Sequence, residues 1–178
     1  MSPYTQEEFT LAKTIRDSIS YFKDVKIVRD DVQQLESFED DTLEQILVID
    51  VFEHVIDLEM AVNAVVHKLK AGGRLIVSVP TNEYAYFFGQ KFDKEIGHVR
   101  HFSIDELKTL FEMKELKTEL IKPYTYYYTS KLCSLFYDKL KDNRLGYLLM
   151  PILNCFSLVT ERIPTDTYTE ILAVFRKH

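Results

Sequence analysis

Apolar residues along the chain follow two spacings, one typical of amphipathic helices and one typical of buried strands. Apolar runs predict five strands, at 25–28, 46–49, 75–79, 116–121 and 169–175. Between the second and third strands, apolar residues at helical spacing predict a helix over 58–69, with Asp57 as its cap and Gly72 and Gly73 as its end. Strand, helix, glycine turn and strand form a βαβ unit, whose strands we expect to be parallel.

Helical spacing also marks the two ends of the chain. Five apolar residues share one face of a predicted N-terminal helix: Phe9, Ala12, Ile15, Ile19 and Phe22. Ser103 and Glu106 have capping-box spacing and predict a helix that continues to about Glu112. Residues 81–102 are expected to form a loop, and residues 130–162 a helical block before the last strand. The sequence shows no repeat or linker, so we expect one α/β domain over 1–178, with 130–162 as an insertion within it.

Composition narrows the classes of function. The 178 residues are 46% hydrophobic and carry a net charge of −6 without a basic cluster, which disfavours nucleic acid as a partner. The longest apolar stretch, 145–159, is too short and too interrupted for a transmembrane span. With no signal peptide visible, we expect a cytoplasmic protein, in which Cys133 and Cys155 are packed thiols.

Polar residues follow the ends of the predicted strands. Asp30-Asp31 follows 25–28, an Asp50-x-x-Glu-His sequence follows 46–49, and Pro80-Thr81-Asn82 follows 75–79. A histidine-rich segment, 97–102, lies just before the capping box. Singly, such an aspartate is more often a turn residue, and such a histidine a bonded partner. Together they predict a ligand site at the carboxyl ends of parallel strands.

Three segments carry a resemblance to a known family. VRDDVQQL (28–35) resembles the third-strand motif of class I S-adenosylmethionine-dependent methyltransferases. ILVIDVFEHVIDLEMAVNAVVHKLKAGGRLIVSVPTNEY (46–84) closely resembles the family's fourth strand, helix and fifth strand. GHVRHFSIDEL (97–107) resembles the branch that acts on small molecules, lipids and sugars. The resemblance implies an incomplete Rossmann-like sheet with flanking helices and a helical insertion before the last strand.

The resemblance also implies how S-adenosylmethionine would bind. Asp31 would hydrogen-bond the adenine amino group, and the backbone NH of Val32 would reach the ring. Asp50 would lie beside the methionine part of the cofactor. We expect the acceptor to be a small molecule, lipid or glycan precursor.

Residues of the acceptor pocket follow from the same resemblance. His54 and His98 are the candidate catalytic residues, because a histidine can take a proton near neutral pH. The expected substrate-binding residues are Glu53, Asn82, Arg100 and His101. Two of these residues could instead have purely structural roles. Glu53 is also typical of the first turn of a helix, and Arg100 could form an ion pair with the acidic loop at 36–44. Some family members associate a similar acidic-x-x-Glu-His sequence with a divalent metal, but we expect no metal here.

One family feature is missing from the sequence. The five glycines are Gly72, Gly73, Gly89, Gly97 and Gly146, so no glycine-rich turn precedes the segments described above. The chain would then lack the first two strands of the family order 3-2-1-4-5-7-6 and bind S-adenosylmethionine weakly or not at all. The strand at 46–49 would have an open edge. Strand 25–28 could close up beside it, a second copy or another subunit could cover it, or the chain is a fragment.

Other functions are also open at this point. A catalytically inactive, methyltransferase-like partner subunit is the main alternative. A nicotinamide-binding protein requires a glycine fingerprint, and a serine hydrolase requires a G-x-S-x-G elbow, and neither motif is present. The tyrosines at 124–128 and the apolar residues that follow them suit a core or dimer face, an acceptor pocket or a membrane surface.

Overall fold

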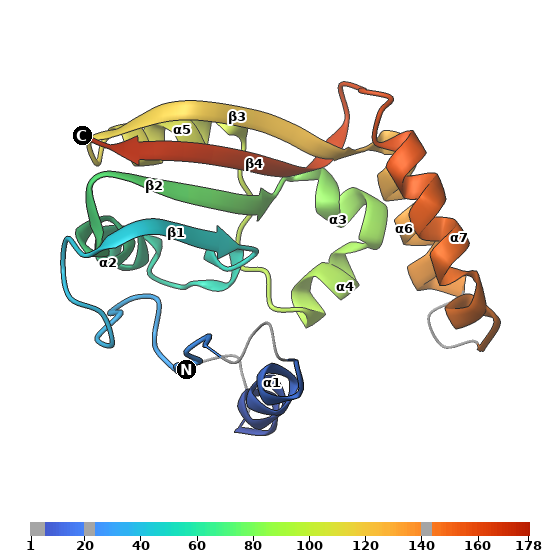
Figure 1. The fold of residues 1–178 in the computed structure, drawn as a ribbon. Helices are drawn as coiled ribbons and strands as arrows, with labels where there is room; N and C mark the ends of the chain where they lie inside the picture. The colour runs from blue at the N-terminus through green and yellow to red at the C-terminus, as the bar shows by residue number, and fades with distance from the viewer. Residues whose placement is uncertain (1–5, 20–23, 140–143) are drawn as a thin grey trace.

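The computed structural model describes residues 6–19, 24–139 and 144–178 (Figure 1). Its helices are α1 (Gln6–Ser18), the 3-10 helix η2 (Phe52–His54), α2 (Leu58–Lys68), α3 (Glu83–Phe88), α4 (Gln90–Glu95), α5 (Ile104–Glu112), α6 (Tyr127–Lys139) and α7 (Arg144–Thr160). Its strands are β1 (Leu43–Ile49), β2 (Leu69–Pro80), β3 (Leu116–Tyr126) and β4 (Tyr168–Lys177), in the order β1-β2-β4-β3. This confirms the predicted α/β fold with a helical block before the last strand.

The βαβ unit forms as predicted, except for its glycine turn. β1 and β2 are parallel, and the side chain of Asp57 accepts a hydrogen bond from the Met60 NH at 2.9 Å. The expectation that the glycine pair ends the helix is wrong, because α2 ends at Lys68 and β2 begins at Leu69. Gly73 instead lies within β2, where an added Cβ would be 2.8 Å from a carbonyl oxygen.

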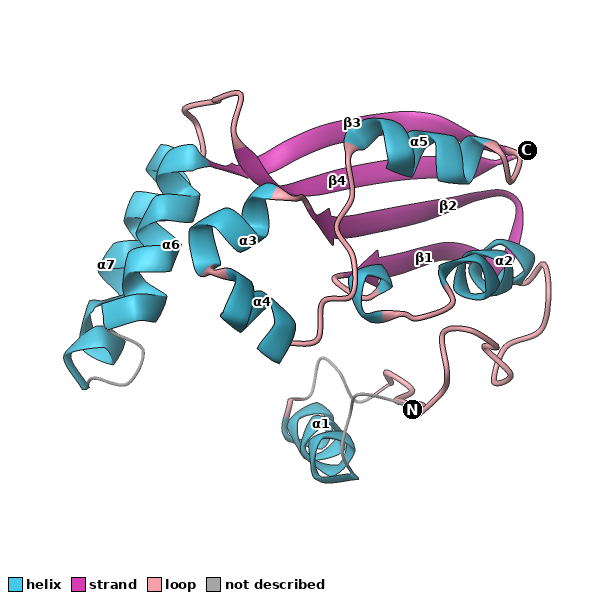
Figure 2. Cartoon of the chain, turned by 180° about the vertical axis from the view of Figure 1, so that it is seen from behind, coloured by secondary structure: helices cyan, strands magenta, loops and turns pink. Residues whose placement is uncertain are grey.

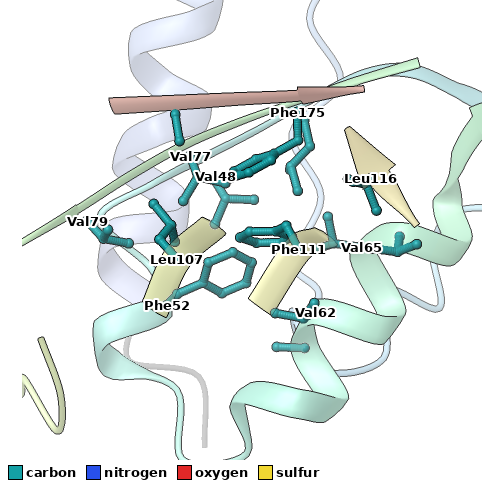
Figure 3. Packing of buried hydrophobic residues seen from close by; sticks show 14 of the residues in the cluster. Val48, Phe52, Val62, Val65, Val77, Val79, Leu107, Phe111, Leu116 and Phe175 are labelled. Carbon is teal, nitrogen blue, oxygen red and sulfur yellow. The ribbon is translucent and has the colours of Figure 1, made fainter. Parts of the chain in front are cut away.

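The hydrophobic core lies between the sheet and two helices. α2 and α5 cover one face of the sheet (Figure 2). Phe111 of α5 packs between Phe52 and Phe175, with ring centroids 6.0 and 4.5 Å apart (Figure 3). The predicted capping box of α5 is present. Because Phe52 is fully buried, it anchors η2 and so fixes the position of the residue that follows it, Glu53.

β1 forms one edge of the sheet, and the strand predicted at 46–49 was expected to have such an open edge. In the described part of the chain, β2 is the only strand that pairs with it. Leu47 and Ile49 of β1 are 60% and 46% exposed. The predicted strand at 25–28 is wrong, because residues 25–31 have no regular structure. An extended segment is stabilised as a strand only when a neighbouring strand pairs with it, and no strand among the described residues pairs with 25–28.

Three further expectations are corrected. The predicted loop at 81–102 contains α3 and α4. The N-terminal helix forms, but Ile15 and Ile19 of its apolar face are exposed, and Phe22 lies outside the described residues. Cys155 is exposed rather than packed, because α7 is covered mainly by α6.

α6 and α7 form a helical hairpin beside the end of the sheet (Figure 1). Several large apolar residues of α7 are exposed: Leu148, Ile152, Phe156, Leu158 and Val159. No helix among the described residues has the length and hydropathy that crossing a membrane requires.

Candidate active site

A cavity of about 210 Å³ lies where β1 and β2 end and β4 begins. It is lined by Asp50, Glu53, His54, Pro80, Tyr84, Ile96, His98 and Glu170. The structure therefore brings the Asp50-x-x-Glu-His sequence together with His98, which belongs to the separate histidine-rich segment. α3 and α4 lie beyond the ends of β1 and β2 (Figure 1). Tyr84 of α3 and Ile96, directly after α4, line the cavity.

Asp50 is held in place by a chain of hydrogen bonds across the sheet. Its backbone has φ 52°, a left-handed conformation that aspartate tolerates better than most residues. Ser78 donates its hydroxyl hydrogen to the Asp50 carboxylate at 2.7 Å. Ser78 has only one such hydrogen, so the Tyr124 hydroxyl, 2.6 Å away, is the donor to Ser78. Burial raises the pKa of Tyr124 to about 12, which keeps it protonated for this role.

The side chain of Glu53 is fully buried. Among the described residues, neither of its carboxyl oxygens has a hydrogen-bond partner, and the nearest imidazole nitrogen, Nε2 of His54, is 3.8 Å from Oε1. Burial raises the pKa of Glu53 to about 8, and the charge of Asp50 adds to the increase. The main chain is well anchored, since the Val99 NH donates to the Glu53 carbonyl oxygen at 2.9 Å. The main chain therefore holds Glu53 in place, while its carboxyl oxygens have no hydrogen-bond partner among the described residues.

His98 is oriented by a buried aspartate. Nδ1 of His98 and Nε2 of His101 lie 2.8 and 2.9 Å from the same oxygen of Asp93, so each donates an N–H to that carboxylate. Burial lowers the pKa of His98, which favours its neutral form. With its proton on Nδ1, His98 turns a free lone pair on Nε2 toward Glu53, whose Oε1 is 4.0 Å away. This is the arrangement of a neutral base held in one tautomer.

Glu170 reaches the cavity from the last strand. In the sheet register it lies opposite Pro80 of β2 and Tyr124 of β3. Burial raises its pKa to about 8, and the charges of Asp50 and Glu53 contribute. Among the described residues, its Oε2 has no hydrogen-bond partner.

Sequence reasoning missed Glu170, Asp93 and Tyr84. A single acidic residue at the start of an otherwise apolar strand was the available signal for Glu170. Asp93 and Tyr84 lie in the segment expected to be a loop, and their convergence depends on α3 and α4.

Three predicted substrate-binding residues lie outside the cavity lining. Arg100 donates to the carbonyl oxygens of Val55 and Ile56, both at 2.7 Å, so it holds the segment after η2 and does not pair with the acidic loop. Asn82 is exposed at the start of α3. His101 supports Asp93 from behind His98.

Asp31 and Val32 belong to a turn beside the start of α2. The Asp31 carboxylate accepts from the Gln33 NH at 2.9 Å, and Val32 packs against the core. The Gln33 side chain accepts from the Asp57 NH at 3.3 Å. This contact ties the turn to the chain segment that follows β1.

The cofactor fit is partial. Asp50, expected at the methionine end of S-adenosylmethionine, is held by Ser78 at the cavity. Asp31, expected at the adenine end, does not line this cavity. The glycines with φ above zero provide no backbone cradle between them. Gly72 lies at the opposite end of β2, and Gly97 faces His54, 3.4 Å from where its Cβ would stand.

Comparisons with known proteins bear on the fold. Residues 4–77 match the family model of a methyltransferase domain. Among solved structures, geranyl diphosphate methyltransferase in complex with SAM (S-adenosylmethionine) is similar, with a TM-score of 0.69, 10% identity and coverage of 98% of this chain and 66% of that chain. The Streptomyces coelicolor A3(2) geranyl diphosphate C-methyltransferase has a TM-score of 0.65 and 12% identity, covering 97% and 60%. The [4+2]-cyclase SpnF has a TM-score of 0.64 and 13% identity, covering 97% and 64%. No curated protein matches the sequence.

The fold is that of the class I S-adenosylmethionine-dependent methyltransferases, and residues 4–77 carry the sequence signature of their domain. This confirms the family resemblance for the segments that lie within the match, 28–35 and 46–77. The chain spans 60–66% of the length of these three structures. The cyclase among them shows that this fold supports other chemistry too, so the reaction must be argued from the site.

Proposed function

We propose that the chain provides the acceptor side of an S-adenosylmethionine-dependent methyltransferase that acts on a small molecule. The observation that carries the proposal is the Asp93–His98 pair. A neutral imidazole, held in one tautomer by a buried carboxylate, faces a cavity beside Asp50. Methyl transfer from a sulfonium requires alignment and a base that takes the acceptor's proton, and this pair is suited to the second task.

Each residue has a defined role in the proposal. Asp50 holds the methionine end of the cofactor, and Asp31 with the Val32 NH holds the adenine. When bound, the cofactor supplies an activated methyl group. His98 is the base, and His54 and Glu53 line the acceptor pocket. Three residues act without lining the cavity. Arg100 holds the segment after η2, and His101 supports Asp93. Asn82 contacts the acceptor as it approaches the cavity.

The proposal also includes association of the chain with a second copy or with another subunit. The open edge of β1 and the exposed Leu47 and Ile49 favour cover by a second copy or by a complementary subunit. We retain a small-molecule, lipid or glycan-precursor acceptor, a cytoplasmic location and a single domain over 1–178, with 130–162 within it, as parts of this proposal.

Titration of the ¹⁵N-labelled chain with S-adenosylhomocysteine, the demethylated product, tests the proposal. We expect weak binding, of millimolar order, with shifts centred on the backbone amides of Asp50 and Val51 and lost in Asp50→Asn. The matched control, Asp105→Asn at the exposed start of α5, should respond like the unmodified chain. Shifts confined to residues remote from the cavity, or unchanged in Asp50→Asn, would contradict the proposal.

A further inference from the structure

The cavity beside His98 has an unbalanced charge. Three of its eight lining residues are acidic, Asp50, Glu53 and Glu170, and none is a lysine or arginine. Arg100 is not among the lining residues. Its guanidinium donates to two main-chain carbonyl oxygens, and its Nε is buried without a partner among the described residues. Asp50 is exposed to solvent, whereas Glu53 is fully buried and Glu170 partly buried. Carboxyl groups that lie close together repel one another when ionised, unless a positive group lies among them.

The same cavity contains hydrogen-bond acceptors without donors. Both carboxyl oxygens of Glu53 and Oε2 of Glu170 are buried, and none has a partner among the described residues. A buried polar group without a hydrogen-bond partner destabilises the folded chain. Asp50 differs, since Ser78 already donates to it. The unmet demand is therefore for N–H or O–H donors directed at Glu53 and Glu170.

We propose that Glu53 and Glu170 bind a protonated amine, so that the methyl acceptor is a primary or secondary amine. This inference rests on the proposed function, because it names the substrate class of the same site. An ammonium group offers several N–H donors and a positive charge, which together meet both demands. The ring of Tyr84, whose centroid is 5.1 Å from that of His98, provides an aromatic face of the kind that attracts cations.

The volume of the cavity favours an organic cation over a bare ion. A water molecule occupies about 30 Å³ of liquid, and the cavity has about 210 Å³. Pro80, Ile96 and Tyr84 give it apolar walls for a carbon skeleton. A neutral hydroxyl group would donate a single hydrogen and leave the charge uncompensated.

The bound amine needs one proton removed before it can act as a nucleophile. One N–H proton passes from R–NH₃⁺ to Nε2 of His98, which gives R–NH₂ and an imidazolium. The nitrogen keeps the electron pair of the broken N–H bond, and no charge is created or lost. The Asp93 carboxylate, which accepts from Nδ1, stabilises the imidazolium. Burial raises the pKa of Glu53 and of Glu170 to about 8, and the charge of Asp50 adds to both increases. A positive group bound among these carboxyl groups favours their ionised form.

Paired probes test the proposal on the chain without a methyl donor. ¹⁵N-labelled protein at pH 8.5 is titrated with cyclohexylamine, which is protonated there as a lysine would be, and with cyclohexanol. The amides of Asp50 and Val99 report on the cavity. We expect saturable shifts with the amine and at least tenfold weaker binding of the alcohol. Glu53→Gln and Glu170→Gln should each weaken amine binding at least tenfold. Glu95→Gln, at an exposed pair with Lys91, should leave it unchanged.

Each other outcome overturns the inference in a recognisable way. Equal affinity for the alcohol and the amine excludes a cation site, and so does unchanged amine binding in both glutamine variants. Shifts at the same amides with magnesium chloride but not with cyclohexylamine would assign the cavity to a metal. If Glu53→Gln does not fold, as judged by the dispersion of its spectrum, Glu170→Gln decides. If amine binding fails but the chain still responds to S-adenosylhomocysteine, the amine inference is overturned and the methyltransferase proposal stands. If the amine binds but S-adenosylhomocysteine does not, the cavity is an amine site and the methyltransferase proposal is contradicted.

Discussion

Glu53 and Glu170 line the same cavity, although one follows the first strand and the other belongs to the last. The sheet order β1-β2-β4-β3 produces this meeting, because β4 runs antiparallel to β2 and so begins at the rim where β1 and β2 end. Neither carboxyl group has a full set of hydrogen-bond partners among the described residues. The fold thus places two costly groups together, as is typical of functional sites.

Stability should fall as pH rises, because of these two groups. The pKa of each is about 8 in the folded chain and near 4.5 when unfolded. The folded state therefore binds more protons between these values. The stabilisation is fully present below about pH 4.5 and is lost as pH rises through 8. A group that is protonated in the folded chain and ionised in the unfolded chain lowers the free energy of unfolding by about 1.4 kcal/mol per pH unit.

Urea unfolding at pH 5.5, 6.5, 7.5 and 8.5 measures this slope. Glu53→Gln and Glu170→Gln should each flatten the decline in the free energy of unfolding, because an amide does not titrate. Glu95→Gln at the surface serves as the control. A stability that is flat or rises over this range in the unmodified chain would show that the two carboxyl groups are not buried together.

Ser78 should be important for stability as well as for the site. Ser78→Ala leaves the Asp50 carboxylate and the Tyr124 hydroxyl without their shared partner, so we expect a loss of about 2 kcal/mol in the free energy of unfolding. Tyr124→Phe keeps the Ser78–Asp50 bond and should cost less. Ser18→Ala, on the exposed side of α1, is the control for a serine hydroxyl that bonds only its own helix. Equal costs for Ser78→Ala and Ser18→Ala would refute the bridging role.

The sequence predicted the framework well and the site in part. Continuous apolar runs and an aspartate cap were enough to predict the parallel pair β1–β2, because burial on both faces and helix capping depend on local sequence. Asp50, Glu53 and His54 follow β1 directly, so their position at the rim was readable. Glu170 was not, because its place depends on the pairing of β4 with β2. The failed strand at 25–28 shows the same limit, since a strand depends on its neighbour.

Two phenylalanines should differ sharply in their effect on stability. Phe111 is fully buried and contacts Phe52 and Phe175, so Phe111→Ala should cost about 3–5 kcal/mol by removing apolar contacts and opening a cavity. Phe156 of α7 is 60% exposed, and Phe156→Ala should cost less than about 1 kcal/mol. Denaturant unfolding of both variants measures the difference. A large cost at Phe156 would mean that another surface covers α7 in solution.

The open edge of β1 leads to a prediction about association. A strand edge with unpaired backbone groups is a template for pairing, and a lysine placed on it opposes that pairing. We therefore expect the chain to associate at rising concentration, and Leu47→Lys to reduce the association. Leu120→Lys, at a similarly exposed position on the opposite edge strand, is the matched control and should change little.

Light scattering across a concentration series gives the mass, and hydrogen exchange gives the protection of amides 46–49. Leu47 is already solvent-exposed, so its replacement should not unfold the chain, and an unchanged urea midpoint confirms this. If the unmodified chain is a stable monomer whose amides at 46–49 exchange freely, the edge is tolerated without cover. If both lysine variants reduce the mass equally, the contact is not specific to β1. Loss of association in Leu47→Lys alone, with the fold retained, would place the interface at the strand that leads into Asp50.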